Sequence, residues 1–248
     1  QIDNIRGASV KRILSTLEKM AKDDEENYKT VWQEFGRVLK EGPAEDFANR
    51  EKIAKLMRFS STHDDSGAQS VSLDDYISRM KPEQEKIYFI TGDSYTAVKN
   101  SPHLELFRKK DIEVLLMHDR VDEWMMSYLN EYDGKQFVSI AKGDVDLGKL
   151  QDKEENKKAE KAGKDFKDVI KKMQEKLGDR VKEVRISNRL TDSPSCLVVQ
   201  QHDMAVSMQK ILKQAGHEVP EIQPILEINP DHILVKQLKG ETNDERFS

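Results

Sequence analysis

The sequence has little cysteine, few aromatic residues and no long hydrophobic run. Its 248 residues include one cysteine, Cys196, and 6% aromatic residues. A single cysteine excludes an internal disulfide and favours a reducing compartment, so we expect a cytoplasmic protein. No segment approaches the roughly 18 apolar residues of a membrane span, and the start lacks the apolar core of a secretion signal. We therefore expect no membrane partner. Because the chain starts at Gln1 rather than Met, we expect a piece of a longer protein.

Charge of one sign does not dominate either. The chain holds 41 Lys and Arg against 46 Asp and Glu, a formal net charge of −5 at pH 7. A dedicated nucleic-acid binder normally carries a strongly basic face, so we expect no nucleic-acid partner. Charged residues make up 35% of the chain and apolar residues 36%, which is typical of a helix-rich protein.

The first ninety residues mainly predict helices. Apolar residues at helical spacing from Val10 to Met20 indicate one buried stripe. A second helix follows an acidic stretch, which favours a helix N-terminus, and Gly42-Pro43 is expected to end it. Its predicted buried face consists of Val31, Trp32, Phe35, Val38 and Leu39. A third helix is expected over 48–57.

The pattern then changes to strands. Two short, wholly apolar runs, 87–90 and 114–117, are separated by helical stretches over 94–100 and 102–109. Such runs joined by a helical crossover predict parallel strands covered on both faces. A further strand is expected over 137–141. Residues 1–150 therefore predict one αβα-layered unit.

A charged connector and a smaller unit are expected after residue 150. Residues 151–165 are polar and charged on all sides, which favours a solvated helical connector. Residues 166–248 predict a small α+β unit. Its expected elements are a helix from Phe166 to a stop at Gly178, strands over 181–187 and 195–200, a helix over 202–215 and a final apolar stretch over 233–238. The fold class is thus a combination of α/β and α+β.

Enzyme motifs are missing from the sequence. It has no phosphate-binding Gly-rich loop, no nucleophile turn and no metal-ligand spacing, so we expect no catalytic residue, cofactor or metal in this chain. Gly92-Asp93-Ser94 is better explained by capping of a following helix. His63-Asp64-Asp65 and His118-Asp119 are expected to be polar residues of exposed loops, and Cys196 a buried, inert thiol.

Two amphipathic segments could be either core or binding surface. From 119 to 129, helical spacing places Val121, Trp124, Met125, Tyr128 and Leu129 on one stripe, which favours burial. Met126 lies off that stripe, and an exposed edge of Trp124 and Met126 would suit binding to varied partners. In the 202–215 helix, the corresponding stripe comprises Met204, Met208, Ile211, Leu212 and Ala215.

Several motifs, in order along nearly the whole chain, resemble the ninety-kilodalton heat-shock chaperone family, most closely its bacterial members. The residues that carry the resemblance to the middle domain are Trp32-Gln33-Glu34-Phe35-Gly36, Lys40-Glu41-Gly42-Pro43-Ala44-Glu45-Asp46, Leu56-Met57-Arg58-Phe59-Ser60-Ser61, Ser72-Leu73-Asp74-Asp75-Tyr76-Ile77-Ser78-Arg79-Met80, Ile87-Tyr88-Phe89-Ile90-Thr91-Gly92, Ser101-Pro102-His103-Leu104-Glu105 and Asp122-Glu123-Trp124-Met125-Met126. Those that resemble the C-terminal domain are Arg189-Leu190-Thr191-Asp192-Ser193-Pro194 and Leu226-Glu227-Ile228-Asn229-Pro230-Asp231-His232.

The resemblance implies part of an ATP-dependent chaperone that binds unfolded or partly folded client proteins. It implies that ATP and Mg²⁺ bind in an N-terminal domain outside this chain, so the chain alone would not be an enzyme. Homodimerisation would need helices beyond residue 248, and disaggregase-type co-chaperones are further expected partners. The expected client-binding residues are Glu123, Trp124, Met126, Ser127, Met204, Met208, Ile211 and Leu212. The alternative is a structural coupler between the ATPase and dimerisation domains, without a client surface.

Overall fold

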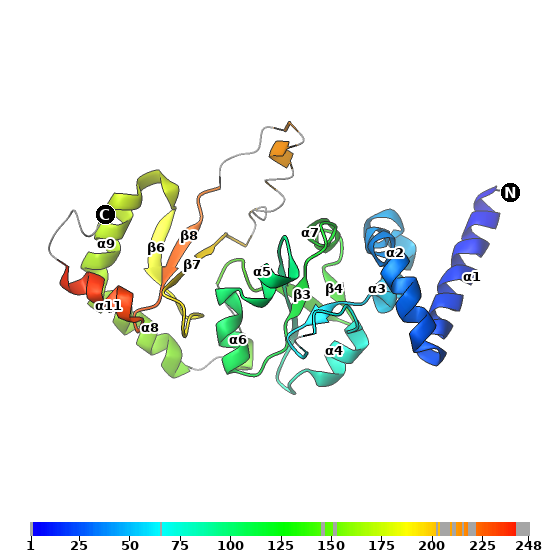
Figure 1. Cartoon of the computed structure of the whole chain (residues 1–248), viewed down its shortest axis with the longest axis horizontal. Coiled ribbons are helices and arrows are strands. Elements are labelled where there is room, and N and C mark those ends of the chain that lie inside the picture. Colours follow the sequence, from blue (N-terminus) through cyan, green and yellow to red (C-terminus); the bar gives the residue numbers. More distant parts are fainter. Residues whose placement is uncertain are drawn as a thin grey trace.

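The computed structural model describes residues 2–241 apart from 65, 145–146, 151–152, 202, 204–208, 210–211, 215 and 218–221. Figure 1 shows the elements spread along one axis, with α1 at one end and α8, α9 and α11 at the other. The helices are α1 (Ile2–Asp23), α2 (Glu25–Glu45), α3 (Arg50–Leu56), α4 (Leu73–Arg79), α5 (Tyr95–Lys99), α6 (Glu105–Lys109), α7 (Asp122–Met126), α8 (Lys153–Asp165), α9 (Lys167–Leu177) and α11 (Ile233–Gly240). Single 3₁₀ turns are η1 (Phe47–Asn49), η2 (Pro102–Leu104), η3 (Gly148–Leu150) and η4 (Gly178–Arg180).

The described residues form two sheets, which lie between the helices. The first has five strands in the order β1-β3-β2-β5-β4 and the second has three in the order β6-β8-β7. The strands are β1 (Ser60–Ser61), β2 (Lys86–Thr91), β3 (Leu115–Met117), β4 (Glu131–Tyr132), β5 (Lys135–Ser139), β6 (Glu183–Ile186), β7 (Ser195–Val198) and β8 (Ile225–Ile228). These helices and sheets confirm the expected mixed α/β and α+β class.

The second helix is longer than predicted and buries a different face. Its buried side follows the i+4 series Tyr28, Trp32, Gly36 and Lys40. Gly36 lets the Trp32 ring lie flat on the helix, since a Cβ there would come within 2.8 Å of the ring. The expected face was therefore wrong in part, because the packing of α1 and α3 against α2 selects the series that includes a glycine and a lysine.

Two further expectations for α2 are corrected. Phe35 and Val38 are 60% and 63% exposed rather than buried. Pro43 lies inside the helix, which continues to Glu45. A proline in the last turn removes only one backbone donor, and the amide of Asp46 still bonds to the carbonyl of Gly42.

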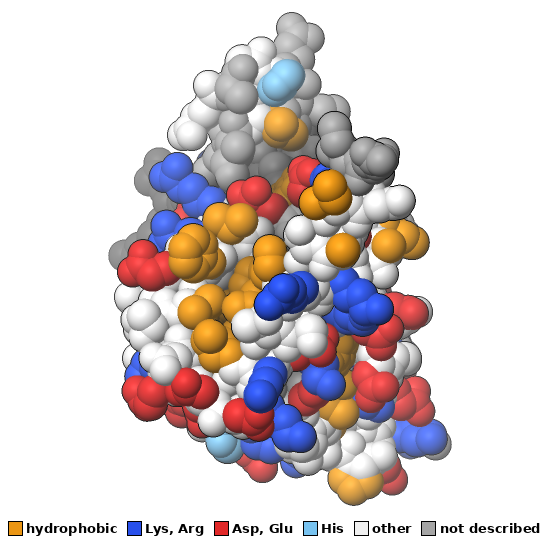
Figure 2. All heavy atoms as spheres, turned by 90° about the vertical axis from the view of Figure 1, so that its right-hand side faces the viewer, with side chains coloured by type: hydrophobic (Ala, Val, Ile, Leu, Met, Phe, Trp, Pro, Cys, Tyr) orange, Lys and Arg blue, Asp and Glu red, His pale blue; other side chains and the backbone are white. Residues whose placement is uncertain are grey.

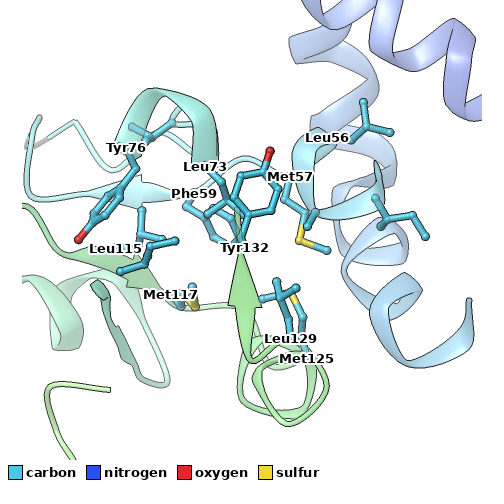
Figure 3. Close-up of a cluster of buried hydrophobic side chains, with 14 of the residues drawn as sticks. Leu56, Met57, Phe59, Leu73, Tyr76, Leu115, Met117, Met125, Leu129 and Tyr132 are labelled. Atoms are coloured by element: carbon cyan, nitrogen blue, oxygen red, sulfur yellow. The ribbon is translucent and has the colours of Figure 1, made fainter. Parts of the chain in front are cut away.

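The central strands of the five-stranded sheet are parallel, as predicted. β2 pairs in parallel with both β3 and β5, while β1 and β4 add antiparallel edges. Alternate residues of β2 enter different cores: Ile87 and Phe89 pack with α1–α4 and α7, whereas Tyr88 and Ile90 pack with α5 and α6. Figure 3 shows the first core, where side chains from α3, α4, β3 and α7 converge. The αβα layering is thus confirmed.

The smaller sheet has helices α9 and α11 packed on it. Phe166, Val169 and Val235 form one core with Val184 and Ile228 of the sheet. α9 ends at Gly178, whose φ of 51° lies in the region open to glycine. The charged segment over 151–165 was expected to be helical, and α8 covers most of it. The boundaries 1–150, 151–165 and 166–248 themselves stay predictions.

Candidate functional site

The candidate client-binding helix, α7, is shorter than the stripe from which it was predicted. Only Asp122–Met126 is helical, although the turn continues through Leu129. Met125 and Leu129 are fully buried in the first core, which confirms the core interpretation for these two residues. Tyr128 is 40% exposed and Trp124 is half-buried, so the predicted stripe is buried on one side only.

The exposed edge of this helix is aromatic. The rings of Trp124 and Tyr128 lie edge to face, with centroids 5.2 Å apart. Met126, expected to face outward, is half-buried and packs against the first core. Ser127 is exposed, and its Oγ donates to the carbonyl of Glu123. The aromatic part of this surface is therefore the Trp124–Tyr128 pair, and whether Met126 also binds clients stays a prediction.

A buried lysine holds the start of α7. Lys40 of α2 is 1% exposed, and its Nζ lies 2.6 Å from Asp122 and 2.8 Å from Asp119. Gln69 extends the network, because its amide donates to Asp119 and its oxygen accepts from the Trp32 indole. Two carboxylates on one ammonium tie the Trp124-bearing helix to α2.

The two carboxylates differ in their electrostatics. Burial raises the pKa of Asp122 despite the opposing attraction of Lys40. Asp119 is also desolvated, but the attraction of Lys40 and the hydrogen bonds from Lys40 and Gln69 outweigh this, so its pKa is lowered. Asp119 is thus a structural anion with an 8% exposed side chain, and the expectation of an exposed loop residue was wrong. The local sequence gives no sign of the distant lysine that pairs with it.

Glu123 is held just as firmly on the other side of α7. Its carboxylate accepts from Thr91 Oγ1 at 2.5 Å and pairs with Lys142 Nζ at 3.2 Å. Thr91 and Lys142 end or follow the parallel strands β2 and β5, and both line a pocket of about 300 Å³. Leu197 of the smaller sheet lines the same pocket and is 55% exposed. The pocket therefore lies at the junction of the two sheets, beside α7.

The chain is similar to known proteins along nearly its whole length. Residues 1–247 match the family model described as Hsp90 protein. The chain belongs to the Hsp90 family. Its relatives include proteins named "Chaperone protein HtpG" from Burkholderia lata (60% identical over 244 residues), Nitrosococcus oceani (54% over 246) and Coxiella burnetii (57% over 247). These alignments cover 97%, 99% and 100% of this chain, but only 38%, 39% and 39% of the relatives.

The second expected client-binding segment of this Hsp90-family chain is described only in part. Met204, Met208 and Ile211 lie outside the described residues. Leu212 is half-buried, and its carbonyl accepts from the amide of His217. Together with the Gly216-to-Lys213 bond, this is the hydrogen-bond pattern that ends a helix. Whether Met204, Met208 and Ile211 bind clients stays a prediction.

The remaining chemical candidates have structural roles. Ser94 caps α5 by accepting from the amide of Ala97, as predicted. Cys196 is buried, and desolvation raises its thiol pKa to about 12, as expected for an inert thiol. His118 contacts Ser60 Oγ and the Tyr95 ring. Within the described residues, no three His, Cys, Asp or Glu side chains are grouped as metal ligands, and no helix is long and apolar enough to cross a membrane.

The residues that sequence reasoning missed are mostly buried ions. Lys40 could have been noticed as the one charged member of the i+4 series of α2. Arg189 and Glu227, described below, lie within motifs that carry the family resemblance, but no local pattern shows that they meet. Ion pairs between segments far apart in the sequence leave no periodic signal.

Proposed function

We propose that this chain is the client-binding part of an ATP-dependent chaperone of the bacterial Hsp90 type. The observation that carries the proposal is the partly exposed Trp124, whose ring lies edge to face with Tyr128. The helix that carries Trp124 is held by the buried Lys40–Asp122 pair on one side and by the mostly buried Lys142–Glu123 pair on the other. Family membership supports the chaperone class.

The physical mechanism is weak contact at several places with apolar segments of unfolded chains. Trp and Tyr offer large apolar area with a polar edge and lose little side-chain freedom on binding, and here Lys40 and Glu123 fix the helix that carries them. Leu197 and the adjacent pocket provide a second apolar contact near α7. Such a site accepts different sequences because it requires only exposed apolar groups.

The other parts of the proposal concern the longer protein. ATP and Mg²⁺ would bind outside this chain, which itself would not hydrolyse ATP. Homodimerisation would also depend on segments outside it, and disaggregase-type co-chaperones are proposed as additional partners. A cytoplasmic location remains an expectation from cysteine content.

An NMR titration of the chain with a soluble, permanently unfolded protein tests the client surface. We expect shifts concentrated on the Trp124 indole, the Tyr128 ring and the Ser127 amide. Trp32 provides an internal reference, because it is 4% exposed and its indole donates to Gln69. Shifts at Trp32 equal to those at Trp124 would contradict the site.

A pair of variants sharpens the test. Trp124→Arg should weaken client binding about tenfold or more, as for loss of an aromatic interface residue, while circular dichroism stays unchanged. Ile13→Arg is the matched control, because Ile13 is 58% exposed and belongs to α1, which lies at one end of the molecule (Figure 1). Equal weakening by both variants would show general hydrophobic attraction and exclude a defined site at α7.

A second candidate function is mechanical coupling between other domains of the longer protein. The observation that favours coupling is the set of buried polar contacts that Arg189 makes between the two sheets. A coupler needs no solvent-facing aromatic pair, so unchanged client binding in Trp124→Arg would favour coupling over client binding.

A further inference from the structure

One fully buried arginine crosses between the two sheets. Arg189 follows β6, is 0% exposed, and points its guanidinium toward the end of β5. Its Nη1 donates to the carbonyl of Ile140 at 2.7 Å and its Nη2 donates to the carbonyl of Gly143 at 2.6 Å. These two carbonyls belong to the segment that leaves the five-stranded sheet.

The same guanidinium is bound to the smaller sheet. Its Nε donates to Glu227 of β8 at 2.8 Å, and Glu227 is 1% exposed. Glu227 also accepts from Ser187 Oγ at 2.9 Å and from Arg185 at 2.7 Å. The charges of both Arg189 and Glu227 are therefore compensated away from water, and the guanidinium links a carboxylate of one sheet to carbonyls of the other.

Two neighbouring contacts reinforce this junction. Glu105, at the start of α6, accepts from the amides of Thr191 at 2.6 Å, Asp192 at 2.8 Å and Ser193 at 3.0 Å. The amide of Gly143 donates to the carbonyl of Val199 at 2.8 Å. The segments before and after β7 are thus attached to the larger sheet at separate points.

The chemistry of this junction indicates positioning. A buried ion pair contributes little net stability compared with apolar packing, because desolvation offsets the attraction. What it provides is directionality: the planar fork of arginine can satisfy a carboxylate and carbonyls in fixed directions, which the single ammonium of lysine cannot. An arginine is needed here because three acceptors from two sheets surround one side chain.

We propose that Arg189 is a positioning residue that locks the five-stranded and three-stranded sheets into one rigid body. It thereby fixes α7 relative to β7. The rigid connection between the sheets does not depend on the proposed function. What rests on that function is the purpose of the connection, which is to hold two client-binding segments in one arrangement.

Residual dipolar couplings of the whole ¹⁵N-labelled chain, without client, test the lock. For the unmodified chain, couplings from the two sheets should fit one alignment tensor. In Arg189→Met the two sheets should require different tensors, and the Gly143 amide should exchange with solvent about tenfold faster or more, as expected for local opening. In Arg189→Lys the two sheets should also require different tensors, because a lysine keeps the charge but not the several directed donors of the guanidinium.

The control is Lys40→Met, which removes another buried cation within the larger unit. It should leave the common tensor intact although it lowers stability. Two tensors in the unmodified chain, or one in Arg189→Met, would overturn the proposal. If Arg189→Met does not fold, Arg189→Lys provides the test: it keeps a buried cation but removes the donors to Ile140 and Gly143, and one common tensor in Arg189→Lys would overturn the proposal.

The same experiment separates this proposal from the client-binding one. Loss of the common tensor with unchanged client affinity would support the lock and contradict its use in presenting clients. A retained tensor in Arg189→Met with client binding at Trp124 would overturn the lock and leave the proposed function standing.

Discussion

Two buried cations in this molecule perform different tasks. Lys40 lies within the larger unit and pairs with two carboxylates, Asp119 and Asp122, which anchor α7 to α2. Arg189 lies between the two sheets and shares its donors between Glu227 and two backbone carbonyls. Both side chains are at most 1% exposed.

The difference shows how side-chain chemistry matches location. An ammonium is a compact charge that suits two neighbouring carboxylates, and the rings of Trp32 and Phe59 lie 5.9 and 5.1 Å from Lys40. A guanidinium has donors in fixed directions and suits acceptors that belong to different bodies. Hence one cluster sets the position of a helix, and the other sets the orientation of two sheets.

The largest expected effect comes from breaking the pair between the sheets. Glu227→Met leaves Arg189 buried without its carboxylate and should lower the free energy of unfolding by about 4–5 kcal/mol, near the upper end for broken buried pairs. Urea denaturation followed by circular dichroism measures this. Arg189→Met combined with Glu227→Met should lose less than the sum of the single variants; additive losses would show that the two side chains are not coupled.

Breaking the lysine cluster should cost somewhat less. Lys40→Met should lower the free energy of unfolding by about 3–4 kcal/mol at pH 7. This loss of stability should become smaller as the pH falls. Without Lys40, burial raises the folded-state pKa of Asp122 further. A carboxyl group whose pKa is raised in the folded state stabilises the fold at low pH, where it is protonated. Urea unfolding at several pH values measures both effects.

A matched control for this variant is Lys55→Met. The Lys55–Asp74 pair is long, at 3.8 Å, and both side chains are more than half exposed. Its removal should change the stability by at most about 0.5 kcal/mol. A loss as large as that of Lys40→Met would show that burial does not distinguish the two lysines.

The junction between the sheets should also respond to pH through His103. Burial and, next, the Arg189 charge lower the pKa of His103 to about 4, while Glu227 and Glu105 act in the opposite direction. Because the folded-state pKa is lowered, its contribution to stability is complete above about 6.5 and is lost as the pH falls toward 4. The pKa difference corresponds to at most about 3 kcal/mol.

His103→Gln should remove this part of the pH dependence. Thermal unfolding of both proteins between pH 7 and pH 4 measures the difference in slope. If the unfolding temperatures of the two proteins fall in parallel with pH, His103 does not titrate between these limits. Any acid sensitivity of the junction would then come from its carboxylates.

The smallest expected effect tests the exposed face of α2. Phe35→Ser and Val38→Ser should each change the free energy of unfolding by no more than about 0.5 kcal/mol, because both side chains are mostly exposed. Leu14→Ala, at a position that is 6% exposed, should cost about 2–5 kcal/mol and serves as the buried control. If Phe35→Ser lowered the free energy of unfolding by several kcal/mol, Phe35 would be buried, as the sequence predicted.

Most elements could be predicted from the sequence because their signals are local. The apolar run of β2, the spacing of α9 with its Gly178 end, and the Ser94 cap all depend on residues within a few positions of one another. α7 was predicted too long, because its stripe continues in a turn that is no longer helical. The candidate client-binding residues came from the family resemblance and stay predictions. No sequence pattern indicated the roles of Lys40 and Lys142, whose ion pairs hold α7 in place.

By itself, the sequence determined most of the secondary-structure types, the parallel central strands of the larger sheet, the family and the helix that carries Trp124, but not β8, the central strand of the smaller sheet. Only the tertiary structure decided which face of α2 is buried, that the Trp124 and Tyr128 rings lie edge to face at a partly exposed edge, and that Lys40 and Arg189 are buried ions. The physical reason is distance along the chain. Periodicity records which local face is apolar, whereas a buried charge is stabilised by partners 38 to 82 residues away, which only folding brings together.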